Sequence, residues 1–169
     1  MIEDSADSPG RLARIFMTEE AIYGLILVSG MLVITGAADA TSVVALVTVA
    51  VTVLVFFAAH VYAGALARLA ANKKVWTLRS SLRSSAVQAS GMLLASAAPI
   101  AILTVGATRV LEDDTAIWTA LIVNTILLGV LGWTAVARWS ARWYVRLGGA
   151  LITAAFGGAL ILLKSVVTH

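Results

Sequence analysis

Five polar side chains have the types and spacing to form one proton-sensitive cluster: Glu19, Glu20, Tyr23, His60 and Gln88. They lie near corresponding ends of three long apolar runs. His60 follows a stretch, 43–59, with no ionisable group, and a helix would place it ~12 Å before Arg68. Imidazole ordinarily titrates near ~6.5, so His60 would be the member most sensitive to pH. The alternative is that His60 only fixes helix packing while the glutamates complement a helix dipole.

A second candidate site combines Pro99 with Asn124. Proline inside a helix removes a backbone donor and frees the carbonyl of residue Ala95, which predicts a kink. A kink beside an amide would form a cation-coordinating site or a gate. The alternative is a stable bend in which Asn124 satisfies the freed carbonyl.

Several chemistries are excluded by the residue inventory. The chain has no cysteine, so disulfides, thiolate metal sites and thiol catalysis are absent. Its two histidines, His60 and His169, form no metal-ligand spacing with each other or with a carboxylate pair. No Ser-His-Asp set, HExxH motif or nucleotide-binding loop is present. We therefore expect a non-enzymatic protein without metal or cofactor.

The elements that position these residues are apolar helices. The 169 residues are 60% hydrophobic and 12% charged, with a mean hydropathy of +0.97, which is typical of a chain embedded in lipid. Residues 1–17 read as a polar tail and interfacial segment, and 18–169 as a single transmembrane domain. We predict an all-α membrane helix bundle of five transmembrane helices, over 19–36, 42–66, 86–107, 115–137 and 147–163.

The basic residues set the expected orientation. With the N-terminus inside, ten lie on the inner side and only Arg109 and Lys164 on the outer side, which favours an N-in, C-out topology. The ten are Arg11, Arg14, Arg68, Lys73, Lys74, Arg79, Arg83, Arg138, Arg142 and Arg146. This placement also accounts for the pI near 9.7 without a nucleic-acid partner. The segment 68–85 reads as amphipathic and surface-lying, and Lys164 is expected to snorkel to the interface.

The last span carries small residues at helical spacing. Gly149, Thr153 and Gly157 form one ridge, and Ala150, Ala154 and Gly158 form another. Small-xxx-small ridges permit close helix packing, and two of them exceed what one neighbour obviously needs. We therefore expect a homo-oligomer, or association with other membrane subunits, within the lipid.

Two stretches, 20–27 and 55–63, resemble a group of uncharacterised integral membrane proteins common in actinobacteria. That resemblance covers most of the chain and implies a bacterial plasma membrane, but no activity. A weaker resemblance is to the transmembrane-175 type potassium-channel family. Arg14 followed by Met17-Thr18-Glu19, and Phe56-Phe57 before His60, match that family's first two helices in order and depth. This chain departs from the family in three respects. The family's serine and aspartate are replaced, Phe57 stands at its tryptophan position, and five spans are expected here where the family repeats six.

Two functions follow as expectations. The first is a small oligomeric cation or proton channel or carrier that uses the inner polar cluster. The second is a non-catalytic accessory or scaffold subunit of a membrane complex, in which the same polar groups only specify packing.

Overall fold

The structure is a computed structural model that describes residues 19–71 and 77–167. Within these residues it has five α-helices and no strand, so the predicted all-α fold with five spanning helices is confirmed. The helices are α2 (Glu19–Ala37), α3 (Ser42–Ala71), α4 (Leu78–Ala107), α5 (Asp113–Ala137) and α6 (Trp143–Val167). Each is long and apolar enough to cross a membrane. The expected interfacial segment 1–17, with Arg14, lies outside the described residues, as does Thr18.

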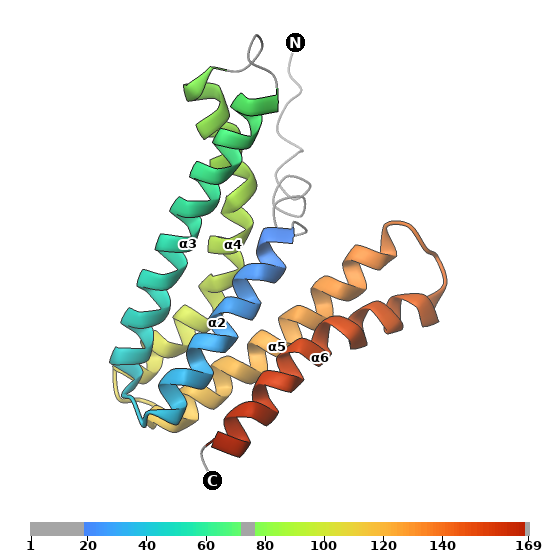
Figure 1. The fold of residues 1–169 in the computed structure, drawn as a ribbon. Coiled ribbons are helices and arrows are strands. Elements are labelled where there is room, and N and C mark those ends of the chain that lie inside the picture. The colour runs from blue at the N-terminus through green and yellow to red at the C-terminus, as the bar shows by residue number, and fades with distance from the viewer. Residues whose placement is uncertain (1–18, 72–76, 168–169) are drawn as a thin grey trace, which may run out of the picture.

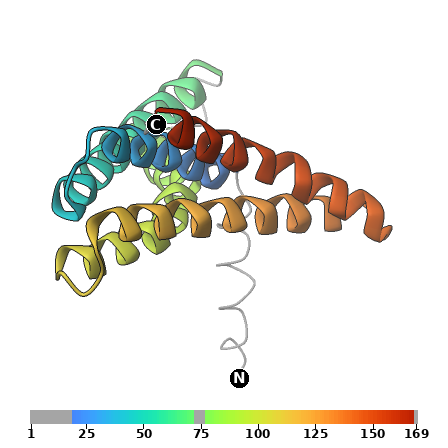
Figure 2. The same cartoon turned by 90° about the horizontal axis from the view of Figure 1, so that it is seen from below.

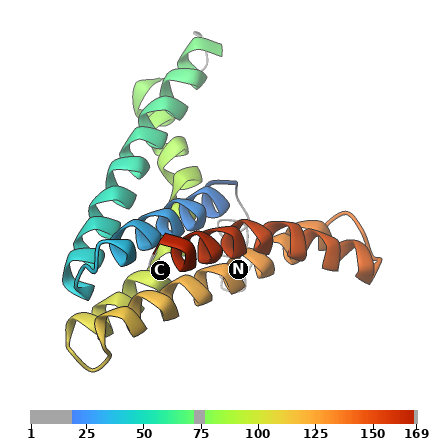
Figure 3. The same ribbon diagram turned by 60° about the horizontal axis from the view of Figure 1, so that its bottom comes forward.

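Two helical hairpins diverge from a central helix. Helices α3 and α4 form one pair, α5 and α6 form the other, and α2 lies between the pairs (Figures 1 and 3). The α2–α3 and α4–α5 connections lie at one end of the bundle, and the two helix pairs spread apart from that end (Figures 1 and 2). Helix α2 contacts each of the other four described helices, so a polar group on α2 can be reached from several elements.

The apolar core surrounds α2, which is the most buried of the five described helices. Leu25, Val28 and Leu32 are at most 1% exposed. They pack with buried residues from the neighbouring helices, including Val49, Met92, Leu103, Ile117, Leu121 and Leu128. Close approach between α2 and α4 depends on Gly24, where an added Cβ would lie 2.8 Å from Cγ of Met92.

Helices α3 and α4 are longer than predicted. Each has 30 residues, or ~45 Å, which exceeds the ~30 Å of a bilayer's hydrocarbon core. Helix α4 begins at Leu78, not near residue 86, because Thr77 and Ser80 form a reciprocal capping box. The described parts of 68–85 therefore extend two spanning helices, and the expectation of a separate surface-lying piece is wrong there. Lys73 and Lys74 lie outside the described residues.

The final helix also extends further than expected. It runs for 25 residues, long enough to span without help from Lys164. Its first ridge packs against α5: an added Cβ at Gly149 would meet Val136, and one at Gly157 would lie 2.5 Å from Oγ1 of Thr125. Ala150 and Ala154, from the second ridge, approach Gly129, which is also on α5. Both ridges therefore contribute to packing within the chain.

Candidate functional site

Glu20 and Gln88 meet at the start of α2. The Glu20 side chain is buried, with 6% exposure, and its Oε1 accepts a 2.6 Å hydrogen bond from Nε2 of Gln88 on α4. Glu20 lies in the first turn of α2, where a negative charge is favoured by the helix dipole. The two residues come from separate spans and the sequence predicted that they share a depth.

Arg68 extends this contact to a third helix. Its Nη2 donates a 2.5 Å hydrogen bond to Oε1 of Gln88, and its Nη1 donates to Oγ of Ser85 and, at 3.1 Å, to the carbonyl of Gly64. An added Cβ at Gly64 would lie 2.9 Å from Oγ of Ser85, so the glycine leaves room for these contacts. We call Glu20, Gln88, Arg68 and Ser85 the Glu20–Arg68 network.

One oxygen of this network has no partner. Oε2 of Glu20 is enclosed by the protein and accepts no hydrogen bond from the described residues. Leaving a buried carboxylate oxygen unsatisfied costs more than leaving a neutral acceptor unsatisfied, typically more than ~1–3 kcal/mol. The second oxygen is therefore an acceptor that no described side chain uses.

The other three predicted members of the cluster do not join this network through any described hydrogen bond. Glu19 is exposed and Tyr23 is 60% exposed. His60 is half-buried, and its Nδ1 lies 3.1 Å from the carbonyl oxygen of Phe56, one turn earlier on α3. The structure thus brings together Glu20 and Gln88 of the five, and adds Arg68 and Ser85, which sequence reasoning missed. The sequence did carry a signal for this contact. Gly64 and Arg68 are four residues apart, on one face of a helix, and residues 84–86 are all small enough to let that face approach.

Asn124 lies in the middle of the bundle, but its amide hydrogens do not bond to the backbone carbonyl that Pro99 frees on α4. Its Nδ2 donates to the carbonyl of Leu25 at 2.6 Å and to Oγ of Ser29 at 2.7 Å, so both amide hydrogens go to α2. The alternative in which Asn124 satisfies the carbonyl of Ala95 is therefore wrong. Pro99 is buried inside α4, which continues as one helix through it. Asn124 is fully buried and its Oδ1 has no partner among the described residues.

Lys164 is fully buried near the end of α6, so the expectation that it snorkels outward is wrong. Its Nζ lies 2.8 Å from Oδ1 of Asp114 and 4.0 Å from the ring centre of Trp118. Gly36 of α2 makes room for the lysine, because an added Cβ there would overlap Cε of Lys164. The ion pair and the cation–π contact satisfy a charge that would otherwise be costly to enclose.

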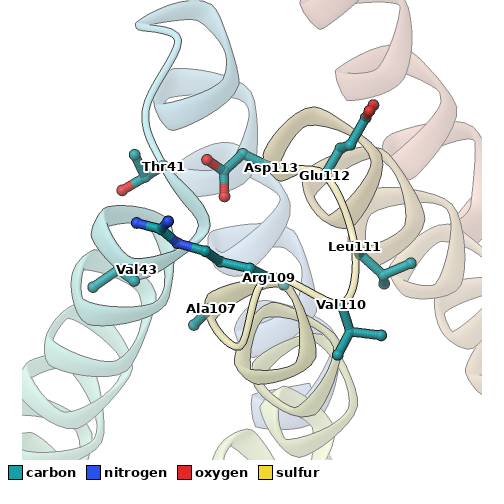
Figure 4. Close-up of a pocket in the computed structure, with 9 residues that line it drawn as sticks. Thr41, Val43, Ala107, Arg109, Val110, Leu111, Glu112 and Asp113 are labelled. Carbon is teal, nitrogen blue, oxygen red and sulfur yellow. The ribbon is translucent and has the colours of Figure 1, made fainter.

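A surface hollow of about 530 Å³ lies where α3 begins and α4 ends (Figure 4). Val43, Ala107 and Val110 supply apolar walls, and Arg109 extends across it towards Thr41. Asp113 at its rim accepts a 2.8 Å hydrogen bond from the backbone N–H of Ser42, which caps α3. The carboxylate is therefore already used in helix capping.

No group of three or more histidine or carboxylate side chains within 19–71 and 77–167 is arranged to hold a metal ion. Searches against protein-family models, curated proteins and solved structures find no match to this chain. The described helices define the class as a multi-pass, all-α membrane protein.

Proposed function

We propose that this chain is a small cation or proton carrier or channel whose ionisable group is Glu20. The observation that carries the proposal is the buried, unpartnered Oε2 of Glu20. Ionisable groups are costly within a membrane span, and those that persist typically mark ion or proton pathways. In Glu20, one carboxylate oxygen is held by a hydrogen bond from Gln88 and the other accepts no hydrogen bond. Such a carboxylate is suited to bind and release a small cationic ligand.

Further polar groups along α2 support this proposal. Glu20 lies at its start, Ser29 with Asn124 lies near its middle, and Gly36 beside the Lys164–Asp114 pair lies near its end. At 1.5 Å per residue, the successive positions are ~13 Å and ~11 Å apart along the helix. Enclosed apolar residues separate them, including Val28 and Leu32. Transport along α2 would require the two hairpins to move relative to this helix.

We propose that the end bearing Arg68, Arg138 and Arg142 faces the cytoplasm of a bacterial cell. We also propose a homo-oligomer. The ridges of small residues on α6 are largely occupied by α5, but Leu151, Ala155, Gly158 and Leu162 share another face of α6. Leu151 and Leu162 are 62% and 68% exposed, and an added Cβ at Gly158 would meet nothing within 4 Å. Cross-linking of Gly158→Cys across this face in membranes would test the association.

The function is tested by flux into liposomes containing purified protein, with separate K⁺, Na⁺ and H⁺ gradients. Glu20→Gln keeps the shape of the side chain but removes its charge, and we expect it to lower flux at least tenfold. Glu19→Gln is the matched control, because Glu19 is exposed and adjacent. Equal flux from Glu20→Gln and the unmodified protein would contradict the role of Glu20, and no flux above empty liposomes would contradict transport.

The second candidate is an accessory or scaffold subunit. It is favoured by the apolar outer face of α3, where Val51, Leu54 and Val55 are each more than half exposed. Lipid alone can cover such a face, but so can another membrane protein. Co-purification of a stoichiometric membrane partner, together with no flux from the well-folded chain, would support this second function over transport.

A further inference from the structure

We infer that the ligand of the Glu20 site is a proton, and that Arg68, acting through Gln88, controls its affinity. This inference rests on the proposed function, since it specifies which ion the site takes. The step is a simple protonation: H⁺ from the adjoining aqueous phase bonds to Oε2, and the carboxylate becomes a neutral carboxyl group. No other bond is made or broken.

The number of available ligand atoms favours a proton over a metal cation. Hard cations are coordinated by about six or more oxygen atoms, or by rings of carbonyls that replace the hydration shell. The Glu20 site offers one free carboxylate oxygen, and the neighbouring amide oxygen of Gln88 already accepts from Arg68. No described histidine or other carboxylate completes a metal-binding group there. A proton needs a single lone pair.

The orientation of Gln88 gives the second reason. Arg68 can only donate hydrogen bonds, so its contact fixes the amide oxygen of Gln88 towards the guanidinium. The amide nitrogen is thereby turned towards Glu20, to which it donates. A metal ion that bridged both oxygens of Glu20 would have to displace this N–H donor from Oε1. Protonation of Oε2 does not, because Gln88 remains bonded to Oε1.

The same chain of contacts makes Arg68 a positioning residue for the site. Its guanidinium fixes the orientation of the Gln88 amide, and it therefore acts on Glu20 across one amide group rather than by a direct ion pair. The other nearby charge on α2 is Glu19, which is exposed. Helix α4 contributes the neutral Gln88 and Ser85, with Arg83 further towards its start. Helix α5 presents Leu128 and Leu131 to the adjoining part of α2. The basic residue that follows on this side is Arg138, at the end of α5.

Infrared difference spectroscopy on the purified protein in lipid vesicles tests the inference directly. Between acid and neutral pH, we expect a carbonyl band from one protonated carboxyl group that persists in Glu19→Gln and disappears in Glu20→Gln. In Arg68→Gln the pH midpoint of that band should change, because Gln88 loses the donor that turns its amide nitrogen towards Glu20. Arg68→Lys keeps a donor and should reverse most of the change.

The experiments distinguish failure of proton binding at Glu20 from failure of the role of Arg68 and from failure of the proposed transport. Absence of the band from the unmodified protein, or its persistence in Glu20→Gln, would overturn the inference, even if vesicles conduct K⁺ or Na⁺. An unchanged midpoint in Arg68→Gln would overturn the role of Arg68. The expected band without flux of any ion would support proton binding at Glu20 while contradicting the proposed transport.

Discussion

The ammonium nitrogen of Lys164 lies 2.8 Å from Oδ1 of Asp114, with the lysine side chain fully enclosed and the aspartate side chain 74% exposed. The pair therefore joins a buried charge on α6 to a solvent-accessible charge at the start of α5. Trp118 supplies a second favourable contact to the same ammonium group. This arrangement connects the last helix to α5 and, through the space left at Gly36, to α2.

The asymmetry of this pair predicts unequal effects on stability. Asp114→Asn leaves a buried ammonium group with weaker compensation and should lower the free energy of unfolding by ~1–3 kcal/mol, below the ~3–5 kcal/mol of a fully buried pair because Asp114 is exposed. Lys164→Met removes the buried charge and should cost less than Asp114→Asn. Unfolding in detergent micelles measures both, with Glu112→Gln as the exposed control. A larger loss in Lys164→Met would contradict the argument.

Gly36→Ala tests the space required by Lys164. The new Cβ would overlap the lysine side chain, so we expect the free energy of unfolding to fall by ~1–3 kcal/mol, as for other overpacked sites. Gly30→Ala is the matched control on the same helix, since its Cβ would meet nothing within 4 Å. We expect Gly30→Ala to be neutral or to stabilise by up to ~1 kcal/mol through helix propensity. Similar effects from the two substitutions would show that Lys164 does not occupy this space.

The contact between Asn124 and Ser29 should appear as a coupling free energy. Interhelical hydrogen bonds in membranes average ~0.6 kcal/mol and reach ~1.7 kcal/mol. A double-mutant cycle with Asn124→Ala and Ser29→Ala should fall within that range, because one amide hydrogen joins the two side chains. Thr119→Ala, whose hydroxyl bonds only within α5, provides the uncoupled comparison. Additive effects of Asn124→Ala and Ser29→Ala would contradict the hydrogen bond.

The Glu20 carboxyl should also be selectively modified by an apolar carbodiimide. Such reagents partition into lipid and react with protonated carboxyl groups, so a proton-binding carboxyl in an apolar setting is favoured over an exposed one. We expect peptide mass spectrometry to locate the adduct on Glu20, with less on Glu19, and labelling to slow as pH rises. Equal labelling of the two glutamates, or labelling independent of pH, would argue against protonation of Glu20 in the membrane.

Length and hydropathy were sufficient to predict the five described spans, because each apolar run matches the thickness of a bilayer. The start of α4 was harder to predict from the sequence. Arg79 and Arg83 resemble interfacial residues in the sequence, whereas the capping hydrogen bonds of Thr77 and Ser80 make residues 78–85 part of the same helix as the third span.

The candidate site was partly predictable because residue position gives depth along a helix. Glu20 and Gln88 were correctly placed at a common depth, and they contact each other. Depth does not determine which face of a helix a residue occupies. That rotation follows from packing contacts such as Gly24 against Met92, which the sequence does not specify. Tyr23 is consequently exposed, although it shares the expected depth.

Lys164 shows the same limitation. A lysine near the end of an apolar run ordinarily extends to the interface, and the sequence contains no local sign that Gly36, far away in the chain, leaves space for it. Burial became favourable only when Asp114 and Trp118 from α5 were brought beside that space.

The most direct test of the central claim is the initial rate of proton entry into liposomes containing the unmodified chain, Glu20→Gln or Glu19→Gln, read with an enclosed pH-sensitive dye. The proposed function predicts proton entry above that of empty liposomes for the unmodified chain and for Glu19→Gln, with at least a tenfold loss in Glu20→Gln. Folded Glu20→Gln protein that admits protons as fast as the unmodified chain would contradict the claim that this buried carboxyl is the transport site.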